Sequence, residues 1–65
     1  MYLLEQRKFN RILKIWKPWE AKISFDEDNS ANPRKEALQT FENIESTEGE
    51  LWRVTHKSHI IIEQR

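Results

Sequence analysis

The 65-residue chain contains no cysteine, one glycine and two prolines. Without cysteine, neither a disulfide nor a thiolate metal site can stabilise the fold. Long apolar runs are lacking too: no stretch approaches the ~20 residues of a membrane-spanning helix. The first residues also lack the long apolar core and small-residue cleavage site of a signal peptide. We therefore expect one cytoplasmic domain that covers residues 1–65.

Apolar residues are scarce, at 37% of the chain, against roughly 45–50% in a typical domain. A domain of this length buries only about 60% of the surface that its unfolded chain exposes. The core must therefore be thin. Small scaffolds usually depend on a disulfide, a metal or a partner for a safe margin of stability, and the first of these is excluded here.

Charge is distributed unevenly, although the net charge is zero. Residues 1–25 contain six basic and two acidic side chains, residues 26–50 two basic and eight acidic, and residues 51–65 three basic and one acidic. Such segregation can produce a dipolar surface that steers charged partners. Alternatively, the segments neutralise one another within the fold.

The first segment, residues 2–17, admits two interpretations. Its apolar side chains recur at i, i+3, i+4 and i+7, the spacing of one helical face: Phe9, Ile12, Leu13 and Trp16. We predict a helix that Pro18 ends. The alternative is a short strand at residues 2–5 followed by a hairpin that turns at Lys17-Pro18.

Later segments have clearer patterns. Alternation of apolar and polar residues predicts a strand over residues 19–25. After a polar loop, Asn32 is a suitable N-cap and Pro33 a suitable first residue for a helix, which should end near Glu45. Two further strands, with a hairpin turn near Lys57-Ser58, are predicted over residues 52–56 and 60–62.

The expected fold is therefore α+β: a small, mostly antiparallel sheet of three or four strands, with one or two helices packed on one face. Trp19 and Trp52 are expected in its core, because aromatic side chains bury large areas. Trp16 shares its segment with several basic side chains and is the better candidate for a binding surface.

Two polar clusters resemble metal sites incompletely. The loop Asp26–Ser30 offers oxygen ligands at the first, third and fifth positions of a calcium loop, but Ala31 and Ala37 occupy the positions that require Gly and Glu. His56 and His59 form a pair, and zinc needs three or four ligands. Neither a Gly-rich phosphate loop nor a nucleophile paired with a base is evident. We predict no catalytic, metal or cofactor site.

Three consecutive isoleucines, residues 60–62, also point to a partner. Alternation along a strand places Ile61 on the face opposite to its neighbours. Either the first segment covers Ile61 as a helix, or the strand is an edge that is open to pairing with another chain.

The leading hypothesis is a small non-enzymatic binding or regulatory protein whose partner is another protein or its own copy. Inhibitors and adaptors of phage or mobile-element type, or a small homodimer, would fit. The expected contact residues are Arg7, Arg11, Lys14, Trp16, Ile60, Ile61 and Ile62. No small-molecule substrate is evident.

The alternative hypothesis is a DNA- or RNA-binding protein, because basic side chains around an aromatic suit phosphate contact and base stacking. The residues concerned are Arg7, Lys8, Arg11, Lys14 and Lys17. The acidic segment 26–50 and the pI of about 6.7 count against it. The same basic segment would also suit an anionic membrane surface, which ranks third.

Overall fold

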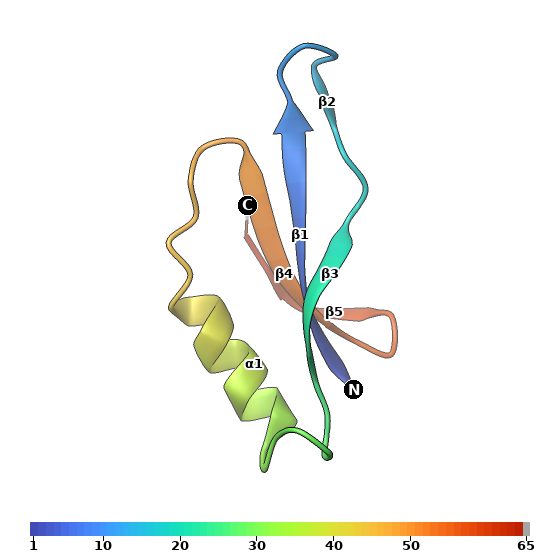
Figure 1. Ribbon diagram of the computed structural model, residues 1–65, viewed down its shortest axis with the longest axis vertical. Coiled ribbons are helices and arrows are strands. Elements are labelled where there is room, and N and C mark those ends of the chain that lie inside the picture. Colours follow the sequence, from blue (N-terminus) through green and yellow to red (C-terminus); the bar gives the residue numbers. More distant parts are fainter. Residues whose placement is uncertain (65) are drawn as a thin grey trace.

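The computed structural model describes residues 1–64, which form an antiparallel five-stranded sheet and one helix. The elements in chain order are β1 (Tyr2–Asn10), β2 (Ile15–Trp16), β3 (Glu20–Phe25), α1 (Pro33–Glu42), β4 (Glu50–His56) and β5 (His59–Glu63). β1 pairs with β4 on one side and with both β2 and β3 on the other, and β5 is the outer strand beside β4 (Figure 1). The α+β class agrees with the prediction, whereas the sheet has more strands than expected.

Residues 2–17 form a β-hairpin, so the helix predicted for this segment is wrong. The chain turns at residues 11–14, so the alternative turn at Lys17-Pro18 is also misplaced. Phe9 and Trp16 are partners across the two strands, with ring centroids 5.4 Å apart. Their separation of seven residues suits a helix and this hairpin equally, and pairing of β1 with β4 along most of its length decides between them.

The helix begins where it was predicted to begin. The Asn32 side chain accepts a hydrogen bond from the backbone N–H of Lys35 at 3.2 Å, and Pro33 is the first helical residue. The Asn32 side chain thus satisfies a backbone donor of the first helical turn that has no partner within the helix. Pro33 has no N–H, and none is needed at the first helical position. The helix ends at Glu42, three residues before the predicted end at Glu45.

The core lies between α1 and the sheet and is thin, as expected. Its buried apolar residues are Leu4, Phe25, Ala37 and Val54. Partly buried side chains pack around them: Tyr2, Phe41, Ile44 and Trp52. Leu4 and Val54 are cross-strand partners on β1 and β4, and α1 contacts β1, β3 and β4. The prediction that Trp52 contributes to the core is therefore confirmed.

A β-bulge in β3 changes which side chains face the helix. Ile23 pairs with Leu4 and Ala21 with Glu5, which leaves Lys22 as an extra residue. Leu4 and Glu5 are successive residues of β1 and point to opposite faces of the sheet. Their partners, Ile23 and Ala21, therefore also point to opposite faces. The strand predicted here is confirmed, but its apolar residues do not all lie on one face of the sheet. The bulge also places Trp19 on the same face as Ala21 rather than on the face of Ile23.

The hairpin predicted at Lys57-Ser58 is confirmed, with φ of 51° and 68° at the two turn residues. Positive φ at both positions is the turn geometry that matches strand twist. A second bulge follows: Ile60 pairs with Thr55 and Ile62 with Val54. Ile61 is the extra residue, and no first-segment helix exists to cover it.

The molecule is elongated, with extents of 41 × 21 × 17 Å. The β1–β2 turn lies at one end and the loop between β3 and α1 at the other (Figure 1). Within residues 1–64, no helix has the length and apolar character needed to cross a membrane.

Candidate interaction surface

The side chain of Asn10 organises the turn between β1 and β2. Its Oδ1 accepts hydrogen bonds from the backbone N–H groups of Ile12 and Leu13, both at 3.0 Å. Asn favours turns because its short side chain can bond to the following backbone in this way. Lys14 completes the turn with φ of 55°, a left-handed conformation that is uncommon outside glycine, Asn and Asp. The turn therefore has a defined backbone.

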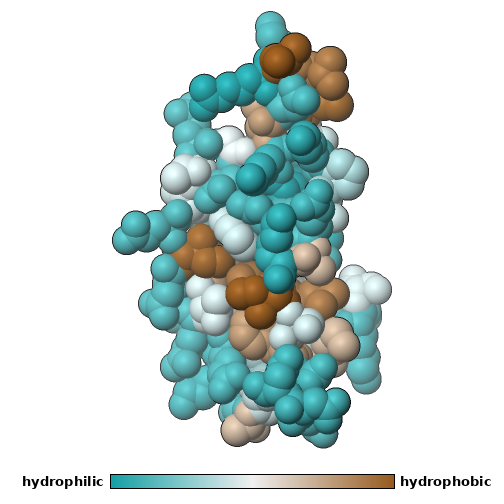
Figure 2. All heavy atoms as spheres, viewed as in Figure 1, coloured by the Kyte–Doolittle hydropathy of each residue, from teal (hydrophilic) through white to brown (hydrophobic). Residues whose placement is uncertain are grey.

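This turn presents two aliphatic side chains to solvent. Ile12 is 91% exposed and Leu13 is 65% exposed, and Figure 2 shows apolar atoms at this end of the molecule. Turns usually carry polar residues, and the exposed Ile15 adjoins this pair. We refer to Ile12 and Leu13 as the apex. Apolar side chains held at a protruding turn are the least expected surface feature of this chain.

Basic side chains surround the apex. Four are exposed and belong to the hairpin: Lys8, Arg11, Lys14 and Lys17. The backbone N–H of Lys17 donates to the carbonyl of Lys8 at 2.8 Å, which places these two lysines side by side at the base of the hairpin. Residues 8–19 contain no acidic side chain, and the nearest carboxylates, Glu20 and Glu50, lie by the base of the hairpin near Lys8. We refer to the four residues as the basic collar.

Stacked arginines and tryptophans support the hairpin stem on the sheet face opposite the helix. The Arg7 Cζ lies 5.0 Å from the ring centroids of both Trp16 and Trp19. The Arg53 Cζ lies 4.1 Å from the Trp19 centroid, and its Nε donates to Glu5 Oε1 at 2.6 Å. Each such cation–π contact contributes about 0.5–2 kcal/mol, more when desolvated. This Arg–Trp ladder joins β1, β2, β4 and the residue before β3.

The ladder changes the roles expected of two residues. Trp19 was predicted to lie in the core, but the bulge at Lys22 places it among guanidinium groups on the other face. Arg7 was predicted as a contact for a partner, yet it is half-buried, and its Nε is buried without a hydrogen-bond partner among residues 1–64. Arg7 therefore supports the hairpin from within.

The other predicted contact residues fall into two groups. Arg11, Lys14 and Trp16, which is 39% exposed, come together on the hairpin. The three isoleucines lie on β5, which forms the outer edge of the sheet and consists of exposed residues. A bulge within an edge strand is one device that discourages pairing with other chains. Of the two groups, the hairpin is thus the better-formed surface.

Sequence reasoning missed the apex, because Ile12 and Leu13 were assigned to the buried face of a helix. The signal that could have revealed it is Asn10, a turn-forming residue directly before the apolar pair. Without the long-range pairing of β1 with β4, that single polar residue could not outweigh the helical spacing.

The opposite end of the molecule carries acidic side chains around a shallow concavity of about 600 Å³. Its lining comprises Met1, Tyr2, Asp26, Glu27, Asp28, Asn32, Pro33, Arg34 and His56. The rings of Tyr2 and His56 stack with centroids 4.1 Å apart. Asp26 Oδ1 accepts hydrogen bonds from the backbone N–H groups of Asp28 and Asn29, which orders the loop. We refer to this feature as the acidic concavity.

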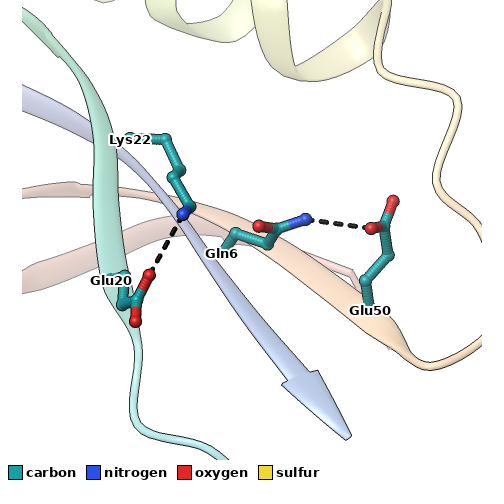
Figure 3. Close-up of polar contacts among 4 residues, drawn as sticks. All are labelled: Gln6, Glu20, Lys22 and Glu50. Carbon is teal, nitrogen blue, oxygen red and sulfur yellow. Dashed lines mark hydrogen bonds and ion pairs between the residues drawn. The ribbon is translucent and has the colours of Figure 1, made fainter.

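Two carboxylates near the stem have structural contacts. Glu50 accepts hydrogen bonds from the backbone N–H of Thr47 at 3.0 Å, from Gln6 Nε2 at 2.9 Å (Figure 3) and from Trp52 Nε1 at 3.3 Å. The bonds from Thr47 and Trp52, the one from Thr47 foremost, lower the pKa of Glu50 below its usual value. Glu20 lies 3.0 Å from Lys22 Nζ, whose hydrogen bond and charge lower the pKa of Glu20.

Within the part of the chain that the structure describes, no three His, Asp or Glu side chains converge to hold a metal ion. Comparison with protein-family models, curated proteins and solved structures finds no match for this chain.

Proposed function

We propose that this chain is a small, cytoplasmic, non-enzymatic binding protein that acts by protein–protein contact through the apex and the basic collar. The observation that carries the proposal is the 91% exposure of Ile12 at an ordered turn that basic side chains surround. Binding would act by occupancy, because the hairpin covers or fills a site on its partner.

The apex and the collar can contribute to binding in different ways. Full burial of an aliphatic side chain contributes about 1.5–3 kcal/mol, so the apex offers a compact source of affinity. The collar would raise the rate of encounter with an acidic partner and select against basic ones. The Arg–Trp ladder holds the stem before binding, which lowers the entropy lost when the complex forms.

Affinity capture with matched variants tests this proposal. We expect Ile12→Ser/Leu13→Ser to abolish the capture of a specific protein that wild type retains. The control, Ile60→Ser/Ile61→Ser, removes two exposed isoleucines from β5 and should leave capture intact. The reverse pattern would assign the contact surface to β5 instead. Affinity of the purified partner for each variant would then separate direct contact from nonspecific retention.

A second candidate function, nucleic-acid binding, is favoured by the collar together with the part-exposed Trp16. The four cations of the collar could follow a phosphate backbone while the indole stacks on a base. For a single strand, four phosphate contacts predict that log K falls with log salt at a slope of about −3. Titration of a labelled oligonucleotide at several salt concentrations measures that slope. A flat response, or binding retained in Lys8→Gln/Lys17→Gln, would contradict this function.

A further inference from the structure

The two ends of the molecule are complementary in shape and in charge. The hairpin end is convex and apolar at its apex, with Arg11 and Lys14 on either side. The other end is hollowed, with the stacked rings of Tyr2 and His56 among its lining residues. Three acidic residues, Asp26–Asp28, also line the concavity, together with two cationic groups, the Arg34 side chain and the amino group of Met1. The protruding apolar turn with its basic neighbours is therefore complementary to the hollow with its acidic side chains.

These two ends cannot meet within one molecule, because they lie at opposite ends of a body 41 Å long. The Debye length at physiological ionic strength is about 8 Å. The acidic end consequently does little to neutralise the collar of its own chain. Both charged regions are available to another molecule.

We infer that the apex of one copy docks into the acidic concavity of a second copy, where Arg11 and Lys14 approach Glu27 and Asp28. This inference rests on the proposed function, since it uses the same hairpin and names its partner. Charge complementarity selects this occupant: the collar requires an acidic surface, and the chain itself supplies one beside a hollow.

The concavity has the capacity and the free groups that docking requires. It is an open depression of about 600 Å³, wide enough to admit the two aliphatic side chains of the apex. Asp26 is engaged in ordering its own loop. Glu27 and Asp28 are exposed and make no ion pair within residues 1–64, so they can pair with incoming cations.

Two assemblies satisfy this contact. Copies that engage reciprocally close into a two-fold dimer, whereas copies that engage head to tail leave free ends and form longer chains. A single apex–concavity contact involves few side chains, which places it among the weak interfaces that bury less than about 1,200 Å². Self-association should accordingly depend on protein concentration and weaken as salt screens the collar.

Sedimentation velocity on the full chain, from micromolar to millimolar concentration and at low and high salt, tests the inference. One variant, Ile12→Ser/Leu13→Ser, removes the apex. The other, Glu27→Lys/Asp28→Lys, reverses the charge of the concavity. We expect each to weaken self-association on the order of 100-fold or more. Matched controls, Ile60→Ser/Ile61→Ser and Glu45→Lys/Glu48→Lys, should associate as wild type does.

Mixing the two impaired variants gives the sharpest outcome. The apex variant keeps a functional concavity, and the concavity variant keeps a functional apex. An equimolar mixture should therefore form one-to-one complexes that grow no further, although each variant alone remains monomeric. Absence of such complexes, when wild type does associate, would overturn the docking geometry. Circular dichroism of each variant confirms that the exposed substitutions leave the fold intact.

Failure of this inference can be distinguished from failure of the proposed function. A wild type that stays monomeric throughout overturns the second copy as partner but leaves another protein as the target of the hairpin. Self-association that the apex variant retains overturns the inference and counts against the hairpin as contact surface. A monomer whose apex is required to bind an oligonucleotide, or vesicles of phosphatidylglycerol, would overturn both.

Discussion

The helix-covered half of this molecule and its hairpin are stabilised by different means. Beneath α1, the side chains of Leu4 and Val54 are almost completely buried, and apolar burial holds the elements together. In the hairpin, the aliphatic residues point into solvent, and stacked guanidinium and indole groups hold the stem. A chain with few apolar residues can thus keep one region stable while it exposes apolar side chains in another.

Truncation in the core should produce the largest loss of stability. Leu4→Ala removes a side chain that is 1% exposed, and such a change typically lowers the free energy of unfolding by about 2–5 kcal/mol. Urea denaturation monitored by circular dichroism measures the loss. A destabilisation of less than about 1 kcal/mol would mean that the site collapses around the smaller residue and that the core is not close-packed.

Weakening the Arg–Trp ladder should have a smaller effect. Arg53→Lys retains the positive charge opposite Glu5 but loses the planar group that stacks on Trp19. We expect a loss of about 0.5–2 kcal/mol in the free energy of unfolding. The same substitution at Arg34, an exposed helical residue, is the control. Equal effects at both positions would show that stacking does not stabilise the stem.

Glu50 should make stability depend on pH. Its pKa in the folded protein is lowered, chiefly by the hydrogen bond from the backbone of Thr47, so the ionised form is favoured on folding. This contribution is complete above the unfolded pKa of about 4.3 and is lost as the pH falls through the lower folded value. Thermal melts of wild type and Glu50→Gln between pH 6 and about 3 should converge as the pH falls. A constant difference would contradict the role assigned to this carboxylate.

The apex should contribute least to stability. Ile12→Ser and Leu13→Ser alter exposed side chains, and surface changes of this kind usually fall within about 0.5 kcal/mol of wild type. Chemical denaturation of the double variant measures this directly. If the variant were strongly destabilised, the apex would have a folding role, and its loss of binding could not be attributed to lost contact.

Local sequence signals were sufficient to locate the helix and the two strands in the second half of the chain. Asn32 and Pro33 mark the start of α1 because capping and a missing N–H act within a few residues. The hairpin at Lys57-Ser58 also follows from two adjacent β-rich segments. Trp52 was also correctly expected to contribute to the core, because aromatic side chains bury large areas.

The first segment could not be assigned in this way. Phe9 and Trp16 are seven residues apart, which matches two helical turns and also a pair across a hairpin with its turn at residues 11–14. The bulge at Lys22 moves Trp19 out of the phase that simple alternation predicts. Both features depend on pairing with residues far along the chain, and intrinsic propensity is a weak prior against such tertiary context.

By itself, the sequence determined the α+β class, the start of the helix, the C-terminal hairpin and the segregation of charge, because each depends on composition or on neighbouring residues. Only the tertiary structure decided that the Arg7 guanidinium lies 5.0 Å from the ring centroids of two indoles and that Ile12 is exposed at a turn beside basic residues. It also placed the basic turn at residues 11–14 and the acidic loop at residues 26–32 at opposite ends of the molecule (Figure 1). These outcomes arise from the register of β1 against β3 and β4, since register selects the face on which each side chain lies.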